Sequence, residues 1–191
     1  MALLVNRIDK TILKRQLKEE TFQRKTISFY RYVTITNPQT LRDELFKTWS
    51  ELQCFGRIYL ATEGINAQMS VPEHHWDEFV EKLNDVAYFK DVPFKYAVDG
   101  NGKSFYKLIV KVRDKIVSDG INDPQFDASN TGKYLNAKEF NAAIEDPNTI
   151  VIDMRNHYES EVGHFKGAIT PDVETFRESL PIINEQLKDF K

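Results

Sequence analysis

Two charged residues directly follow an apolar segment in the last quarter of the chain. Residues 149–152 are Thr-Ile-Val-Ile, Asp153 and Arg155 come next, and Glu159 and His164 lie a few residues farther on. Such a segment is typical of a buried strand, and α/β folds place their sites at the carboxyl ends of such strands. Asp153 and Arg155 are therefore expected just past the carboxyl end of this strand, and we assign a catalytic role to neither of them.

Five cations recur at odd positions, and aromatic residues lie between them. They are Lys103, Lys107, Lys111, Arg113 and Lys115, interleaved with Phe105 and Tyr106. Residues of one parity project from one face of a strand. A one-sided basic strand with aromatic neighbours suits contact with an RNA backbone and its bases. The alternative is the solvated outer face of a sheet whose other face is core.

Residues 56–67 form a second distinctive stretch, Gly-Arg-Ile-Tyr-Leu-Ala-Thr-Glu-Gly-Ile-Asn-Ala. The residues themselves favour a tight hairpin, in which Gly64 supplies permissive backbone angles and Asn66 forms local hydrogen bonds. The alternative places Arg57 and Asn66 on a surface that meets a phosphate or a base.

The residues that commonly act as nucleophiles or metal ligands are sparse. Cys54 is the only cysteine, so the chain has no intrachain disulfide and no cysteine-based zinc site. A lone cysteine in an apolar setting is usually an inert small hydrophobe. His157 and His164 lack the helical spacing of a metal-binding pair, and we expect His164 to order a turn instead.

The composition is that of an ordinary globular protein, with 41% hydrophobic and 29% charged residues. No apolar run approaches the roughly 18 residues of a membrane span, and the first residues lack the pattern of a secretory signal. We therefore expect a cytoplasmic protein. Residues 1–118 carry a net charge of +4 and residues 119–191 one of −7, which suggests two domains with different partners.

The first two thirds of the sequence predict an α+β domain. Residues 7–25 are interpreted as a basic, weakly amphipathic helix, either a solvated arm or an arm that contacts phosphates. Strands are expected at residues 27–35, 55–61, 65–71 and 94–98, with helices at residues 38–53 and 76–83. This βαββαβ order predicts a ferredoxin-like domain over residues 26–115, and residues 105–112 add another strand.

The last third predicts part of an α/β domain. Gly120, Pro124 and Gly132 mark residues 116–135 as a linker. A helix is expected at residues 136–144, a strand at 149–153, and two short helices separated by Pro181 within residues 171–191. Because one strand leaves unpaired edges, residues 136–191 are interpreted as the N-terminal part of a larger parallel domain.

The stretch from Asp153 to Ile169 resembles the opening of a rhodanese domain. Several segments together resemble one family more closely, the bacterial rhodanese-related tRNA uridine hydroxylases that act on the wobble uridine. These segments are residues 29–32, 56–67, 102–105, 111–113, 116–120 and 153–159. The resemblance covers residues 26–191. It implies an acylphosphatase-like (ferredoxin-like) domain followed by a rhodanese-like domain.

The same resemblance implies a function. The activity would be oxygen-dependent 5-hydroxylation of the wobble uridine, with molecular oxygen as co-substrate and no other cofactor visible. The partner would be the tRNA anticodon arm, with neither membrane nor DNA expected. Candidate RNA contacts are Arg31, Arg57, Lys103, Lys107, Lys111 and Arg113. The rhodanese structural motif would comprise Asp153, Arg155, Glu159 and His164. The resemblance implies that Asp153 and Arg155 hold loops together through charge-assisted hydrogen bonds.

The sequence departs from the family at the reactive cysteine. In the family this residue lies in a loop of the Cys-Thr-Gly-Gly-x-Arg-Cys type, which no position here matches. Such loops stabilise a thiolate with successive backbone N–H groups. We expect the loop beyond Lys191, assign no catalytic residue, and predict that the 191-residue chain is inactive by itself but still binds RNA.

Two other functions remain open at this stage. One is a rhodanese-type sulfurtransferase that carries a cysteine persulfide, which would add sulfur rather than oxygen to its acceptor. The other is a non-catalytic module that binds RNA or protein.

Overall fold

The chain folds into two compact units, Met1–Val117 and Ser118–Lys191. The computed structural model describes residues 8–97, 104–117, 119–121, 123, 130 and 132–188. Among these residues, every helix is too short or too polar to cross a membrane.

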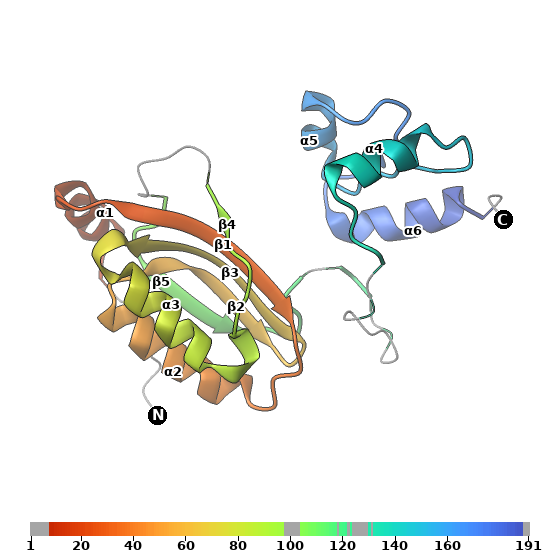
Figure 1. The fold of residues 1–191 in the computed structure, drawn as a ribbon. Coiled ribbons are helices and arrows are strands. Elements are labelled where there is room, and N and C mark those ends of the chain that lie inside the picture. Colours follow the sequence, from red (N-terminus) through yellow and green to blue (C-terminus); the bar gives the residue numbers. More distant parts are fainter. Residues whose placement is uncertain are drawn as a thin grey trace. The chain divides into compact units, whose positions relative to one another are not determined.

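The first unit contains a mixed five-stranded sheet of order β4-β1-β3-β2-β5 (Figure 1). Strands β1 and β2 run antiparallel to β3, β4 runs antiparallel to β1, and β5 runs parallel to β2. The strand bounds are Arg24–Tyr32 (β1), Phe55–Ala61 (β2), Gly64–Pro72 (β3), Lys95–Tyr96 (β4) and Leu108–Val112 (β5). The expected ferredoxin-like order is thereby confirmed, and β5 extends it at the β2 edge.

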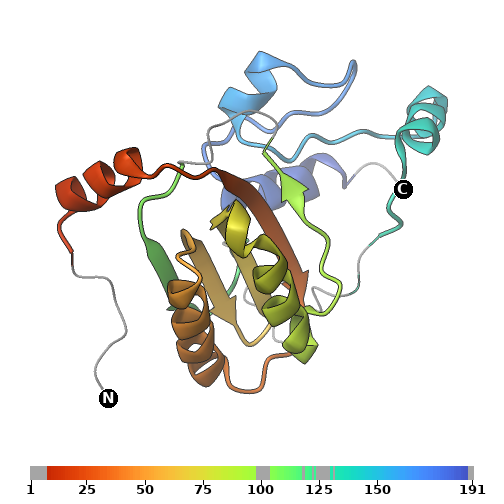
Figure 2. The ribbon, with the colours of Figure 1, turned by 60° about the vertical axis from the view of Figure 1, so that its left-hand side comes forward.

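Two helices cover one face of this sheet, α2 (Pro38–Glu51) and α3 (Trp76–Asp85), as Figure 2 shows. Helix α2 begins where the Asn37 side chain accepts a hydrogen bond from the Thr40 amide, and Pro38 occupies its first turn. Short 3₁₀ turns flank α3 at Glu73–His75 (η1) and Ala87–Phe89 (η2).

The core lies between these two helices and the sheet. Alternate strand residues such as Ile27, Ile58 and Met69 point toward the helices and pack in one cluster with Trp49 and Phe79. The residues between them point to the opposite face, which α2 and α3 leave open.

Helix α1 spans Lys10–Glu19, and so the helix expected over residues 7–25 is wrong at its C-terminal end. The backbone becomes extended at Glu20, and Arg24 and Lys25 already belong to β1. A bidentate ion pair from Arg24 to Glu20, with distances of 2.7 and 2.8 Å, joins the end of α1 to the start of the strand. The charge pattern predicted that the helix continues to residue 25. Arg24 is instead buried in the sheet, and the chain forms a strand from there.

The second unit contains the helices α4 (Ala137–Glu145), α5 (His157–Val162) and α6 (Phe176–Gln186). The strand expected at residues 149–153 is reduced to an isolated parallel bridge between Ile152 and Ile169. The expected break at Pro181 is also wrong, because α6 runs through it. Ser179 and Ile183, one turn apart and both buried, hold the helix on both sides of the proline.

Candidate nucleic-acid interface

The strand register brings two rows of side chains together on the open face of the first unit. The first row crosses all five strands as Lys95, Ser28, Gln68, Arg57 and Ile109, each paired with the next. Neighbouring strands lie about 4.8 Å apart, so the row carries a cation on either side of a hydroxyl and an amide.

The second row runs beside the first and contains Tyr30, Asn66, Tyr59 and Lys111. Tyr30 is 45% exposed, and the Lys95 ammonium lies 5.8 Å from the centre of its ring. The Arg113 guanidinium lies 5.2 Å from the centre of the Tyr59 ring. Aromatic rings and cations therefore alternate along this face.

The sheet itself carries no negative charge. None of the five described strands contains an aspartate or a glutamate. Arg57, Lys111 and Arg113 are all exposed. A surface with positive charge and tyrosines suits a single-stranded nucleic acid, whose backbone seeks cations and whose bases stack on aromatic rings.

Asn66 and Glu63 have structural roles at one end of this face. The Asn66 amide donates to the Ile116 carbonyl at 3.2 Å, and the Glu63 carboxylate accepts from the Ile116 amide at 2.7 Å. Gly64 lies between them with φ of +145°, and a Cβ there would lie 2.0 Å from the Arg31 carbonyl oxygen. The tight hairpin expected from the sequence is present.

The structure brings together only some of the predicted RNA contacts. Arg57, Lys111 and Arg113 share the open face, and Lys107 lies at its margin, 5.9 Å from the ring centre of Tyr106. Arg31 points to the other side of β1, where its guanidinium donates to the carbonyls of Lys90 at 2.6 Å and Tyr88 at 3.4 Å. Lys103 lies outside the described residues.

Lys95, Tyr30 and Tyr59 were missed as members of this face. Tyr30 and Tyr59 alternate with core residues along their strands, and that parity was the available signal, whereas β4 has only two residues, both exposed, and offers no such pattern for Lys95. Their meeting in space depends on the pairing of four strands, which a local pattern does not specify.

Helix α1 offers a second basic surface. Leu13 and Leu17 are buried, whereas Lys10, Lys14, Arg15 and Lys18 line a shallow hollow of about 480 Å³ on the same helix. Arg15 forms an exposed pair with Glu19 at 3.9 Å. This arrangement is compatible with the phosphate-contacting arm as well as with the solvated arm.

Cys54 is buried in the core of the first unit. Burial raises the pKa of its thiol to about 12, although the charge of Arg24 acts in the opposite direction. A thiol is nucleophilic only as the thiolate, so Cys54 is chemically inert near neutral pH.

In the second unit, Asp153 and Arg155 form the contact expected from the sequence. Arg155 donates to the Asp153 carboxylate at 2.5 Å and to the Gly163 carbonyl at 2.6 Å. The hydrogen bond from Arg155 holds the pKa of Asp153 below its usual value. The pair thus ties the segment after Ile152 to the turn after α5.

Glu159 and His164 also stabilise this turn. Glu159 completes a capping box with Asn156 at the start of α5. The Nδ1 atom of His164 is hydrogen-bonded to the Ser160 carbonyl at 2.9 Å.

Phe140 and Phe165, with ring centres 4.7 Å apart, line a hollow of about 690 Å³ beside Asp153. Within the described residues, no group of three or more potential ligands is placed to hold a metal ion.

The fold and the sequence comparison together define the class of the first unit as an acylphosphatase-like domain. Residues 24–116 match the family model of the UPF0176 acylphosphatase like domain.

Comparison with curated proteins then identifies the relatives of the chain. A protein of Leptospira interrogans is 54% identical over 184 residues, which are 96% of this chain and 50% of that protein. A protein of Escherichia fergusonii is 50% identical over 192 residues, which are 100% of this chain and 55% of that protein. A Salmonella typhimurium protein is 50% identical over 99% of this chain and 54% of its own length.

All three relatives are named tRNA uridine(34) hydroxylase. The chain is therefore a homologue of the tRNA uridine(34) hydroxylases over almost all of its length, and the resemblance seen in the sequence is confirmed. It spans about half the length of the curated relatives it matches.

Proposed function

We propose that this chain is part of an enzyme that hydroxylates the wobble uridine of tRNA, with its first unit binding the anticodon arm. The observation that carries the proposal is the identity of about half of all residues to proteins named for that reaction. Molecular oxygen is the proposed source of the added oxygen atom.

The open face of the first unit supports the assignment of RNA binding. Arg57, Lys111 and Arg113 would neutralise phosphates, while Tyr30 and Tyr59 would stack on bases of the anticodon loop. Loops are the parts of RNA in which bases are unstacked and accessible to such contacts.

The second unit would act as a rhodanese-like scaffold in this proposal. Asp153, Arg155, Glu159 and His164 form contacts that hold loops in place. Cys54 is excluded from covalent chemistry by its burial and its raised pKa of about 12. We therefore place no covalent step on this chain's own cysteine and predict that these 191 residues alone do not hydroxylate tRNA.

The activity is tested by mass spectrometry of tRNA nucleosides from a strain that lacks the gene. We expect 5-hydroxyuridine derivatives to disappear and to return when the full-length reading frame is restored. Unchanged hydroxyuridine would contradict the proposal, and a simultaneous loss of thiolated nucleosides would favour the sulfurtransferase instead.

RNA binding is tested separately with the 191-residue chain and an anticodon stem-loop. We expect Arg57→Gln and Lys111→Gln each to weaken binding. Each should also reduce the slope of log K against log[salt] by roughly 0.7 for the lost phosphate contact. Lys82→Gln is the matched control, because Lys82 is exposed on α3 on the other side of the sheet. Equal effects of all three substitutions would contradict a specific role of the open face.

A further inference from the structure

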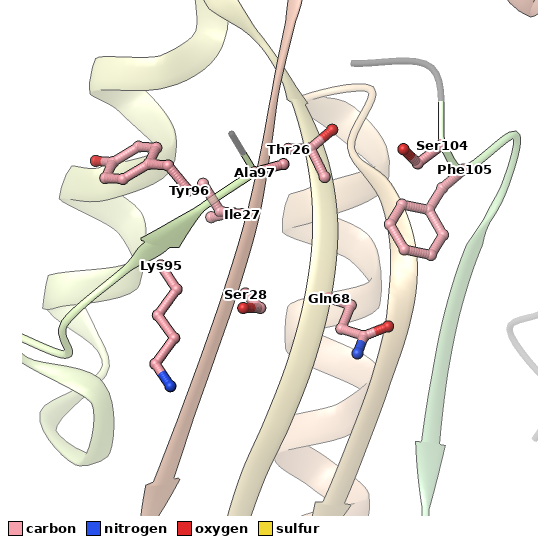
Figure 3. A pocket seen from close by; sticks show the side chains of 9 residues that line it. All are labelled: Thr26, Ile27, Ser28, Gln68, Lys95, Tyr96, Ala97, Ser104 and Phe105. Carbon is pink, nitrogen blue, oxygen red and sulfur yellow. The ribbon is translucent and has the colours of Figure 1, made fainter. Parts of the chain in front are cut away.

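The open face contains a hollow of about 290 Å³ at the β4 side (Figure 3). Its lining includes Thr26 and Ser28 from β1, Gln68 from β3, Lys95 from β4, and the segment Ser104 and Phe105. Sites for small molecules begin at about 300 Å³, so this space suits a group the size of one nucleotide base rather than a larger ligand.

The floor of the hollow is polar. Ser28 and Gln68 are direct partners across β1 and β3, and they offer a hydroxyl and an amide side by side. The Thr26 hydroxyl is buried and forms no hydrogen bond within the described structure. A buried hydroxyl without a partner is unfavourable unless a ligand or water supplies one.

The walls differ in character. The Phe105 ring lies over the sheet beside Gln68, whereas Lys95 extends along the opposite margin (Figure 3). Tyr96 also borders the hollow, but its ring is directed away and packs near Trp76 and Phe94, with ring centres at 5.9 and 6.4 Å. The hollow thus combines one available aromatic face, a hydrogen-bonding floor and a cation.

We propose that this hollow holds one unpaired nucleotide of a bound RNA strand. The base lies against Phe105, its polar edge meets Gln68 and the hydroxyls of Ser28 and Thr26, and its phosphate lies near Lys95. This inference rests on the proposed function, because that function supplies RNA as the ligand.

The strand register gives the RNA a continuous path from the hollow. Gln68 is paired with Arg57 in the same row, and the row of Tyr30, Asn66 and Tyr59 lies beside it. The bound RNA would therefore extend from the hollow toward further cations and aromatic rings. Paired nucleotides do not fit this path, since their base edges are already engaged.

The test measures binding of the 191-residue chain to a short single-stranded oligouridine and to a duplex RNA of equal length. Phe105→Leu is expected to weaken oligouridine binding about tenfold, which is within the range for loss of one stacked base, and to leave duplex binding unchanged. Gln68→Ala is also expected to weaken oligouridine binding. Phe46→Leu is the matched control, because Phe46 is half-buried on α2 on the other side of the sheet, and this variant should bind as the unmodified chain.

An unchanged affinity of folded Phe105→Leu for oligouridine would overturn the proposal. Ultraviolet crosslinking of oligouridine to the unmodified chain provides a readout without substitution. A crosslink in the peptide 104–107 is expected, and crosslinks confined to other peptides would also overturn it. If Arg57→Gln weakens binding while Phe105→Leu does not, the hollow is excluded and RNA binding by the open face stands. If neither substitution matters, both proposals fail.

Discussion

The first unit buries a continuous apolar core, whereas the described part of the second unit buries few hydrophobic side chains. In the first unit, the cluster extends from Ile27 on β1 to Val110 on β5. In the second, Val173 and Ile183 are buried among the described residues, while Tyr158, Val162 and Phe165 are exposed. A sheet covered by two helices is held by packing, while the second unit depends more on caps and loop hydrogen bonds.

This difference predicts where stability resides. Regions with few buried apolar contacts open at low cost, and densely packed strands open only with the whole domain. Substitutions of the same chemical type should therefore have unequal effects in the two units.

Removing a core ring should have the largest effect. Phe79 is fully buried, with its ring centre within 6.2 Å of those of Trp49, Trp76 and Phe94. We expect Phe79→Ala to lower the free energy of unfolding by about 3–5 kcal/mol, measured by urea unfolding and circular dichroism. The matched Val162→Ala, at a side chain 91% exposed, should change it by less than about 0.5 kcal/mol. Equal losses would refute the contrast between the two units.

The reactivity of thiols sharpens the same contrast. Because burial raises the pKa of Cys54 to about 12, iodoacetamide at pH 8 should alkylate it roughly a thousandfold more slowly in the folded chain than in urea. A cysteine introduced by Val162→Cys should react at nearly the same rate in both conditions. The fold favours the neutral thiol of Cys54, so its stabilising contribution is complete below the unfolded pKa and is lost as the pH rises toward 12. Fast alkylation of Cys54 in the folded chain would show that the core around this thiol is accessible to the reagent, and would contradict the prediction.

Two ion pairs provide the next comparison. The Arg24 side chain is 1% exposed and pairs with Glu20, whereas Arg155 is 47% exposed and pairs with Asp153. Arg24→Met should cost about 3 kcal/mol of unfolding free energy, because it leaves a partly buried carboxylate and two carbonyls without their donor. Arg155→Met should cause only a small change, since exposed pairs contribute little. Similar unfolding curves for the two variants would contradict this expectation.

The smallest effect concerns the Asp153 carboxylate. Its pKa is lowered chiefly by the hydrogen bond from Arg155, so its contribution is present above the ordinary pKa and is lost as the pH falls through the folded value. An NMR titration should show Asp153 ionising below its ordinary range, and Arg155→Met should raise that pKa. No shift in the variant would mean that the contact does not persist in solution.

The sequence predicts the first unit well because its elements follow local periodicity. The residue 55–61 strand and the α2 buried face of Leu41, Leu45 and Trp49 are found as expected. The parallel pairing of β5 with β2 and the meeting of Lys95 with Tyr30 were not predicted. Both depend on contacts between segments that are distant in sequence, which periodicity does not encode.

The second unit was less predictable for a different reason. The helix expected at residues 136–144 is observed within one residue, because Asn136 and Glu139 form a local capping box. The strand at residues 149–153 was predicted from its apolar content, yet apart from its bridge to Ile169 it pairs with no described residue. An apolar segment becomes a strand only when a neighbour completes its hydrogen bonds.

The placement of β5 also affects how readily the edges of the sheet pair with strands of other chains. Without it, β2 would present a seven-residue unpaired edge, which is a template for intermolecular pairing. At the opposite margin, β4 has only two residues, one of them Lys95, and short edges with lysine resist such pairing. Strand β5 forms the edge on the β2 side instead, and it is shorter, with five residues that include Lys111, whose charge disfavours intermolecular pairing.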